Sequence, residues 1–232
     1  AQIEPVKDIH VNKPRVWALT HGMIHTEPGD FIKDGTIVIR DGKIEKVGRY
    51  IKVPLDAYEI DLEGAHVYAG FIDSWLTVKQ DEKTTSPSQH WNSKIRADYR
   101  AKDDLKIKEK DLKALHSVGM TAAHVVPEKG IIKGQSDLVV LSKEPVSVSE
   151  SVAQVLEFKA SSWSDREYPN SLLGTIALIR QTIMDAEWYE KARAITEKFP
   201  ADNEPVKHDA SLAALEKFRA NRLPMLFMTN HE

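Results

Sequence analysis

Short runs typical of β-strands, separated by turn residues, occur along the chain between residues 15 and 68. They occur at 16–19, 23–25, 36–40 and 43–48. The last two runs are separated by Asp41-Gly42, and this dipeptide between alternating strands is the strongest short-range sign of a β-hairpin. The pattern predicts a small β-sandwich or open barrel over residues 15–68. Residues 1–14 contain two prolines and no periodicity, and they are expected to form a flexible arm.

The hydrophobic pattern changes after residue 68. Apolar runs of strand length occur at 70–77, 120–126, 137–141, 155–158 and 223–228. Apolar stripes with helical spacing occur at 103–117, 172–184 and 209–220. A polar stretch at 79–103 indicates a long loop, and Asn170 or Ser171 is a suitable N-cap for the second helix. Strands that alternate with helices favour a parallel α/β arrangement, with about four β/α units over residues 69–232.

About four β/α units amount to half of a TIM barrel, which has eight units and typically about 250 residues. The edges and inner face of a half barrel would remain uncovered, which parallel sheets do not tolerate. We therefore expect this chain to be the amino-terminal part of a larger assembly, completed by a second polypeptide or by a further C-terminal region. An obligate partner of this kind buries more than about 2,000 Å².

Composition narrows the class of protein. The chain has 232 residues, 41% of them hydrophobic and 29% charged, which is typical of a soluble globular protein. A net charge of −3 gives no electrostatic reason to expect a nucleic-acid partner, and no apolar run is long enough to span a membrane. The absence of cysteine excludes disulfides and thiolate chemistry. A start at Ala1-Gln2 resembles a processed exported protein, so a periplasmic location is expected, with a cytoplasmic one as the alternative.

The strand expected after residue 69 reads Gly70-Phe71-Ile72-Asp73-Ser74-Trp75-Leu76-Thr77. It resembles the first barrel strand of the amidohydrolase superfamily, where a Pro-Gly-Phe-Ile-Asp run leads into a His-x-His pair of metal ligands. Residues 18–48 and 60–67 resemble the composite β-domain and the linker strand of that superfamily. Residues 119–136 and 168–185 resemble segments of its imidazolonepropionase-like subgroup.

The resemblance implies a composite β-sandwich followed by the first half of a TIM barrel. It also implies a hydrolase of non-peptide carbon–nitrogen bonds that uses zinc or another divalent metal. The two metal positions map onto Trp75 and Thr77, side chains that share one face of a strand. An indole offers no lone pair to a metal and a threonine hydroxyl is a poor ligand, so the His-x-His motif is lost. Trp75 is expected to pack in the core instead.

No catalytic residue, metal ligand or cofactor is therefore assigned to this chain, because the later ligands of the family map at or beyond residue 232. Three other residues are candidates for a pocket or for orienting a metal ligand. Asp73 lies where the family keeps an aspartate, and its alternative role is to accept backbone hydrogen bonds. His124 lies on the second strand expected in the barrel, and a hydrogen-bonded core residue is the alternative.

Glu157 is the third candidate, because it precedes Phe158 near the carboxyl end of a strand, where barrel enzymes place their chemistry. A solvent-facing salt bridge is its alternative role. His21 and His25 lie four residues apart, or about 13 Å along a strand, which is too far for one ion. We expect them to have structural or surface roles.

Two functions of different classes fit these observations. The first is a non-catalytic, amidohydrolase-like portion of a larger hydrolase, inactive by itself, in which an intact unit elsewhere performs the chemistry. The second is a structural or interaction subunit of a multi-chain assembly without a hydrolase role. A strand carrying Asp-x-His-x-His in the same protein or in a co-purifying chain would favour the first function.

Overall fold

The computed structural model describes residues 14–79, 90–159 and 167–229. The predicted arm at residues 1–14 therefore lies outside the described residues, except for Pro14. The chain divides into two compact units, residues 1–69 and residues 70–232. Each unit is built around its own five-stranded sheet.

The described part of the first unit, which begins at residue 14, contains five strands. They are β1 (Val16–Glu27), β2 (Asp30–Arg40), β3 (Lys43–Gly48), β4 (Tyr58–Asp61) and β5 (His66–Val67). The sheet order is β3-β2-β1-β4, and β5 pairs with β1. Asp41 and Gly42 have φ angles of 49° and 77°, which a two-residue turn between twisted strands requires, so the predicted hairpin is confirmed. The predicted form of this region is a sandwich or an open barrel, and the described residues of this unit form one sheet and not the two packed sheets of a sandwich.

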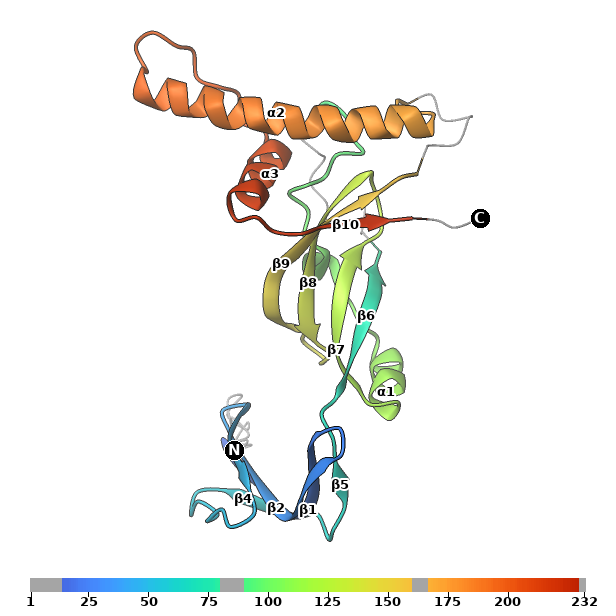
Figure 1. Cartoon of the computed structure of the whole chain (residues 1–232), viewed down its shortest axis with the longest axis vertical. Helices are drawn as coiled ribbons and strands as arrows, with labels where there is room; N and C mark the ends of the chain where they lie inside the picture. The colour runs from blue at the N-terminus through green and yellow to red at the C-terminus, as the bar shows by residue number, and fades with distance from the viewer. Residues whose placement is uncertain (1–13, 80–89, 160–166, 230–232) are drawn as a thin grey trace, which may run out of the picture. The chain divides into compact units, whose positions relative to one another are not determined.

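The described residues of the second unit form five strands and four helical segments. They are β6 (Phe71–Val78), the 3₁₀ helix η1 (Ala101–Asp104), α1 (Glu109–Ser117), β7 (Met120–Pro127), β8 (Ile132–Val140), β9 (Val146–Glu157), α2 (Leu172–Lys198), α3 (Ala210–Ala220) and β10 (Met225–Met228). The sheet order is β10-β9-β8-β7-β6. Figure 1 shows the strands side by side, with α2 and α3 at the end of the sheet where β9 finishes.

The wholly parallel arrangement predicted for this unit is wrong at β8. β6 pairs in parallel with β7 and β9 pairs in parallel with β10, but β8 is antiparallel to both of its neighbours. A parallel connection needs a crossover of about a dozen residues or more. Only residues 128–131 join β7 to β8, and only residues 141–145 join β8 to β9. These short connections force a meander in the middle of the sheet.

The helix predicted over residues 103–117 begins later, at Glu109. Leu105 and Ile107, which precede it, both pack against the core beside β6 and β7. Residues i and i+2 point to the same side of an extended backbone, whereas in a helix they point to different sides. The helical spacing in this part of the sequence therefore included residues that the core holds in an extended segment.

The predicted loop at 79–103 also has a structural role. Residues 80–89 lie outside the described residues, but Ile95 and Arg100 form isolated parallel bridges with β8. Ile95, Ala97 and Ala101 are fully buried. The described part of this loop is therefore a buried layer against the sheet, followed by η1.

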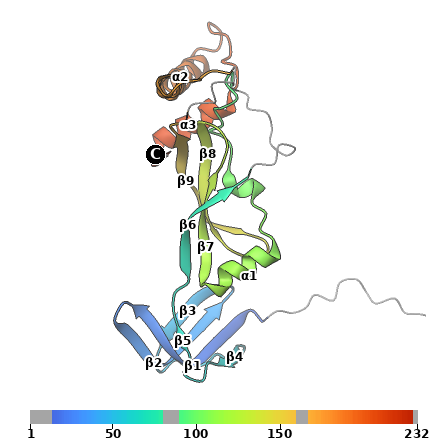
Figure 2. The ribbon, with the colours of Figure 1, turned by 90° about the vertical axis from the view of Figure 1, so that its right-hand side faces the viewer.

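Two hydrophobic clusters hold the second unit together. One joins the loop around Ile95 and the end of β9 to α2 and α3, and its largest side chains include Ile132, Leu156, Leu178 and Leu215. The other joins β6, β7 and β8 to the segment that contains α1, which lies beside β7 (Figure 2). The Ser171 hydroxyl accepts a hydrogen bond from the Gly174 N–H and caps α2, as predicted.

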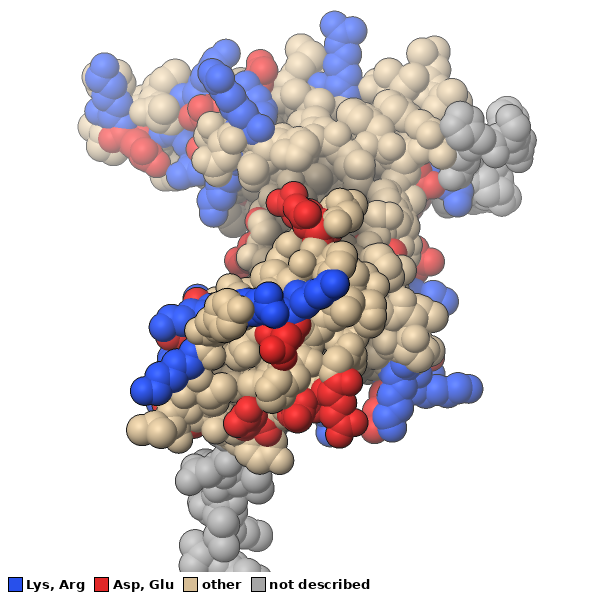
Figure 3. All heavy atoms as spheres, turned by 60° about the horizontal axis from the view of Figure 1, so that its bottom comes forward, with Lys and Arg blue, Asp and Glu red and all other residues tan. Residues whose placement is uncertain are grey.

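The surface carries both signs of charge. On the face shown in Figure 3, acidic and basic side chains are interspersed and no continuous basic area is visible. No helix among the described residues has both the length and the apolar character that crossing a bilayer requires.

Candidate functional site

The strand that resembles the metal strand of the amidohydrolase family is β6, and it contains a bulge. Asp73 pairs with Ala123 of β7, whereas Leu76 pairs with Val125, so three steps on β6 oppose two on β7. Within the bulge the Asp73 carboxylate accepts a hydrogen bond of 3.0 Å from the backbone N–H of Trp75. Asp73 thus makes the backbone contact that was its alternative role.

Trp75 and Thr77 are both exposed on β6, and 38% of Trp75 is accessible. The predicted core packing of Trp75 is therefore wrong for the described structure. The indole and the hydroxyl do not supply the imidazole, thiolate or carboxylate donors that a divalent metal needs. The residues at this position do not fit the metal that the resemblance implies. Among the described residues, no group of three His, Cys, Asp or Glu side chains lies close enough to hold a metal ion.

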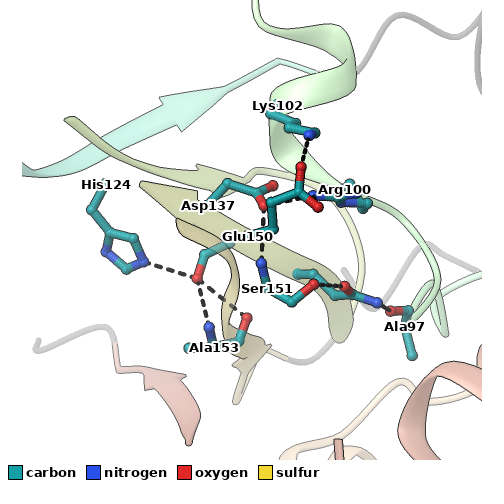
Figure 4. Close-up of polar contacts among 10 residues, drawn as sticks. Ala97, Arg100, Lys102, His124, Asp137, Glu150, Ser151 and Ala153 are labelled. Carbon is teal, nitrogen blue, oxygen red and sulfur yellow. Dashed lines mark hydrogen bonds and ion pairs between the residues drawn. The ribbon is translucent and has the colours of Figure 1, made fainter. Parts of the chain in front are cut away.

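His124 lies on β7, and its ring contacts both neighbouring strands. Nδ1 is 3.2 Å from the Ser74 carbonyl oxygen on β6, and Nε2 is 2.8 Å from the Ser136 hydroxyl on β8. Ser136 in turn bonds the backbone of Ala153 on β9, accepting from its N–H at 3.1 Å (Figure 4). A carbonyl only accepts, so Nδ1 carries a proton in its contact with Ser74. The single proton of the Ser136 hydroxyl has two acceptors within reach, Nε2 of the neutral ring at 2.8 Å and the Ala153 carbonyl oxygen at 3.2 Å.

A histidine beside a serine hydroxyl is also the arrangement that activates a nucleophile. Ser136 is fully buried, however, and its oxygen already accepts the Ala153 N–H, so no substrate reaches it. The contact therefore joins four strands of the sheet through side chains and does not perform acyl transfer. His124 occupies the hydrogen-bonded position that was the alternative to a pocket residue.

Glu157 is the last residue of β9, and it is buried rather than solvent-facing. Its Oε2 atom lies 2.7 Å from Nζ of Lys133 on β8, and the two side chains are 10% and 3% exposed. The Lys133 ammonium also donates to the Glu128 carbonyl. The predicted solvent-facing position of this salt bridge is thus wrong. The sequence did not identify Lys133 as the partner, because Lys133 lies on another strand.

A second cluster of charged side chains lies where η1 meets β8 and β9 (Figure 4). Arg100 contacts Asp137 at 3.0 Å and Glu150 at 3.1 Å. Hydrogen bonds from Lys102 and then Arg100 lower the pKa of the Glu150 carboxyl. Oδ1 of the fully buried Asp137 also accepts the backbone N–H of Ser151 at 3.0 Å. Two cations and two anions balance here, which indicates a structural ion cluster.

A cavity of about 520 Å³ opens at the carboxyl end of β6. Its lining is Leu76, Thr77, Val78, Lys79, Asp104, Leu105, Lys106, Ile107, Asp111 and Leu115. The Tyr99 hydroxyl donates to the Asp104 carboxylate at 2.9 Å, and burial, with that carboxylate, raises the pKa of Tyr99. The volume suits a small ligand, but the lining is aliphatic and holds charges of both signs.

The first unit places His21 and His25 in different surroundings. His21 has a φ of 54° at a bulge in β1, and its ring lies 3.2 Å from the Asp61 carboxylate. His25 stacks on Tyr68, with ring centroids 4.2 Å apart, and its Nε2 lies 2.9 Å from Nδ1 of His66. The expected surface roles agree with this geometry. The contact with His66 arises from the pairing of β5 with β1, and no sequence pattern indicated it.

Comparison with known proteins identifies a fold. No family model matches the chain, and no curated protein matches it. Among solved structures, the chain is similar to an amidohydrolase from Thermotoga maritima MSB8, with a TM-score of 0.69 and 18% identity over 90% of this chain and 57% of that one. A second amidohydrolase structure covers 27% of this chain and 15% of its own length at 25% identity, and its TM-score of 0.25 carries no argument.

The first similarity shows that the chain has an amidohydrolase-like fold. It also shows that the chain spans a little over half the length of the Thermotoga maritima protein, 57%.

Proposed function

We propose that this chain is a non-catalytic, amidohydrolase-like portion of a larger hydrolase that acts on non-peptide carbon–nitrogen bonds. The observation that carries the proposal is the pair Trp75 and Thr77, which stands on β6 where the family resemblance places two metal-binding histidines. Neither side chain is a suitable ligand for zinc or a related metal. The chemistry then belongs to another part of the same protein or to a partner chain.

Exposed apolar side chains on the second unit support the proposal of a larger assembly. Phe71 and Ile72 of β6 are 63% and 57% exposed, and Phe227 of β10 is 43% exposed. These strands are the two edges of the sheet. Fully burying one such side chain contributes about 1.5 to 3 kcal/mol, and a whole domain is stable by only about 5 to 15 kcal/mol. Further polypeptide along these edges would bury these side chains and would add substantially to the free energy of unfolding of the second unit.

Metal analysis and a hydrolase assay on the purified chain test the first part of the proposal. We expect no stoichiometric zinc, iron or manganese and no hydrolysis of cyclic or other non-peptide amides. The double substitution Trp75→His with Thr77→His places two imidazoles two residues apart on β6, and we expect it to increase zinc affinity. The matched control is Thr77→Ala. Stoichiometric metal that is bound by the unmodified chain and lost in this control would contradict the proposal.

Isolation of the protein from its native source tests the assembly. We expect the chain to be accompanied by further polypeptide that carries an intact His-x-His strand and hydrolyses a non-peptide amide. An assembly that contains the chain, lacks such a strand and lacks amide hydrolysis would instead establish the interaction-subunit function.

A further inference from the structure

Helix α2 is apolar on two opposite sides. Its buried side faces α3 and the loop around Ile95, and it contains Thr175, Leu178, Ile179, Thr182, Ala186 and Tyr189. Four large apolar side chains lie on the other side: Leu173, Met184, Trp188 and Ile195, with 78%, 54%, 62% and 52% of each exposed. At 100° per residue these four fall within about 60° of one another, opposite the buried side. An apolar stripe on a helix typically packs against another element of structure.

The outer face forms a continuous stripe along the helix. Its positions are 173, 177, 180, 184, 188, 191 and 195, each three or four residues after the one before. This spacing is the one that packed helix pairs use, and the 22 steps from residue 173 to residue 195 give the stripe a length of about 33 Å. We call these seven positions the outer stripe. In Figure 1, α2 extends along the outer side of α3, away from the sheet.

The outer stripe is complementary to itself in one orientation. Leu173 and Ile195 lie eleven residues before and after Met184, and Arg180 and Trp188 lie four residues before and after it. When two copies of α2 run antiparallel with Met184 facing Met184, Leu173 of one copy faces Ile195 of the other. Arg180 then faces Trp188, the aromatic residue that binds a guanidinium best.

The parallel orientation lacks this complementarity. It would place Arg180 against Arg180 and Lys191 against Lys191, and like charges that face each other are destabilising. In the antiparallel orientation Lys191 faces Ala177, which is small and leaves room for the lysine stem. Neither Arg180 nor Lys191 makes an ion pair with another described residue of its own chain.

We propose that α2 is a dimerisation helix that binds a second copy of this chain, antiparallel, with the two-fold axis at Met184. A two-fold contact uses the same surface on both partners, which is what the symmetric spacing about Met184 provides. Specific interfaces bury at least about 1,000 Å² in total, and two facing stripes of this length and side-chain size reach that range. The proposal concerns α2 alone and does not depend on whether the chain takes part in a hydrolase.

Disulfide cross-linking tests the geometry directly, because the chain contains no cysteine. Under mild oxidation of the full chain, we expect Met184→Cys to give a covalent dimer. Ile195→Cys alone should give none, since its two copies lie about 33 Å apart along an antiparallel pair. An equal mixture of Leu173→Cys and Ile195→Cys chains should give the mixed covalent dimer. Each substituted residue is more than half exposed, so the fold is retained, and far-ultraviolet circular dichroism checks this.

Sedimentation equilibrium supplies a second, independent measurement. We expect Trp188→Ala to raise the dimer dissociation constant about tenfold or more, as loss of a central aromatic contact does. The matched control is Trp91→Ala, which removes a tryptophan that is 68% exposed elsewhere on the same unit and should leave the constant unchanged. Self-cross-linking of Ile195→Cys would overturn the proposal in favour of a parallel pair. A monomer without a Met184→Cys cross-link, or a different protein bound on α2, would also overturn it.

Discussion

Lys133 and Glu157 form an ion pair inside the protein, with 2.7 Å between Nζ and Oε2 and with side chains only 3% and 10% exposed. The pair joins β8 to the carboxyl end of β9, where both strands meet the cluster that holds α2 and α3. Each of these two buried charges is stabilised by the other. If one is removed, water cannot reach the remaining charge to stabilise it.

Removal of one member of this pair should therefore be more costly than removal of both. We expect Lys133→Met or Glu157→Gln to lower the free energy of unfolding by about 3 to 5 kcal/mol, and Lys133→Met with Glu157→Leu to recover most of that loss. Urea denaturation measures both changes. Lys113→Met breaks the exposed pair with Glu109 and should cost about 0.5 kcal/mol or less. Equal costs for the buried and exposed single variants would contradict this account.

The Ser136 hydroxyl should contribute to stability and not to catalysis. Ser136→Ala removes the hydroxyl that contacts the Ala153 N–H and Nε2 of His124, and we expect a loss of about 1 to 3 kcal/mol in thermal or urea unfolding. Ser117→Ala is the control, because that hydroxyl donates to the Ala114 carbonyl at an exposed position. A Ser136→Ala protein with unchanged stability would show that the contact is dispensable.

Glu150 should make stability depend on pH in the acid range. Lys102 and Arg100 lower the pKa of Glu150 from its ordinary value of 4.5 in the folded protein. Its contribution is therefore fully present above that value and is lost as the pH falls through the lower, folded value. We expect the free energy of unfolding to decrease less between about pH 6 and pH 3 in Glu150→Gln than in the unmodified chain.

Chemical denaturation at a series of pH values measures this difference. Glu59→Gln, which replaces an exposed carboxylate on β4 that makes no ion pair with another described residue, is the control. An identical pH dependence in Glu150→Gln and in the unmodified chain would contradict the assignment.

Gly134 should be intolerant of a side chain. Its φ is +122°, and an added Cβ would lie 2.4 Å from the Tyr99 carbonyl oxygen, where the described loop crosses β8. We expect Gly134→Ala to cost about 2 kcal/mol or more, from backbone strain and overpacking together. Gly29 has a φ of +91° with nothing within 4 Å of the added carbon, so Gly29→Ala should cost about 1 kcal/mol. Differential scanning calorimetry compares the two, and equal costs would argue against the close approach.

Local chemistry made several features predictable from the sequence. The Asp41-Gly42 turn, the Ser171 cap of α2 and the range of β3 depend on residues within a few positions of one another. The unsuitability of Trp75 and Thr77 as ligands is a property of their functional groups and needs no structure. The amidohydrolase-like segments of the sequence agree with the structural similarity to the Thermotoga maritima protein, which establishes the fold.

The tertiary structure alone decided which segments meet. The place of Glu157 at a strand end makes it a candidate, but its partner Lys133 lies on a strand whose antiparallel direction the apolar pattern does not reveal. The bond between His124 and Ser136 depends on the same reversal. Apolar periodicity indicates which side of a strand is buried, whereas direction and neighbours depend on connection lengths and on packing between distant residues. The sequence by itself therefore determined the local elements and the missing ligand chemistry, and long-range packing determined the contacts of the polar residues.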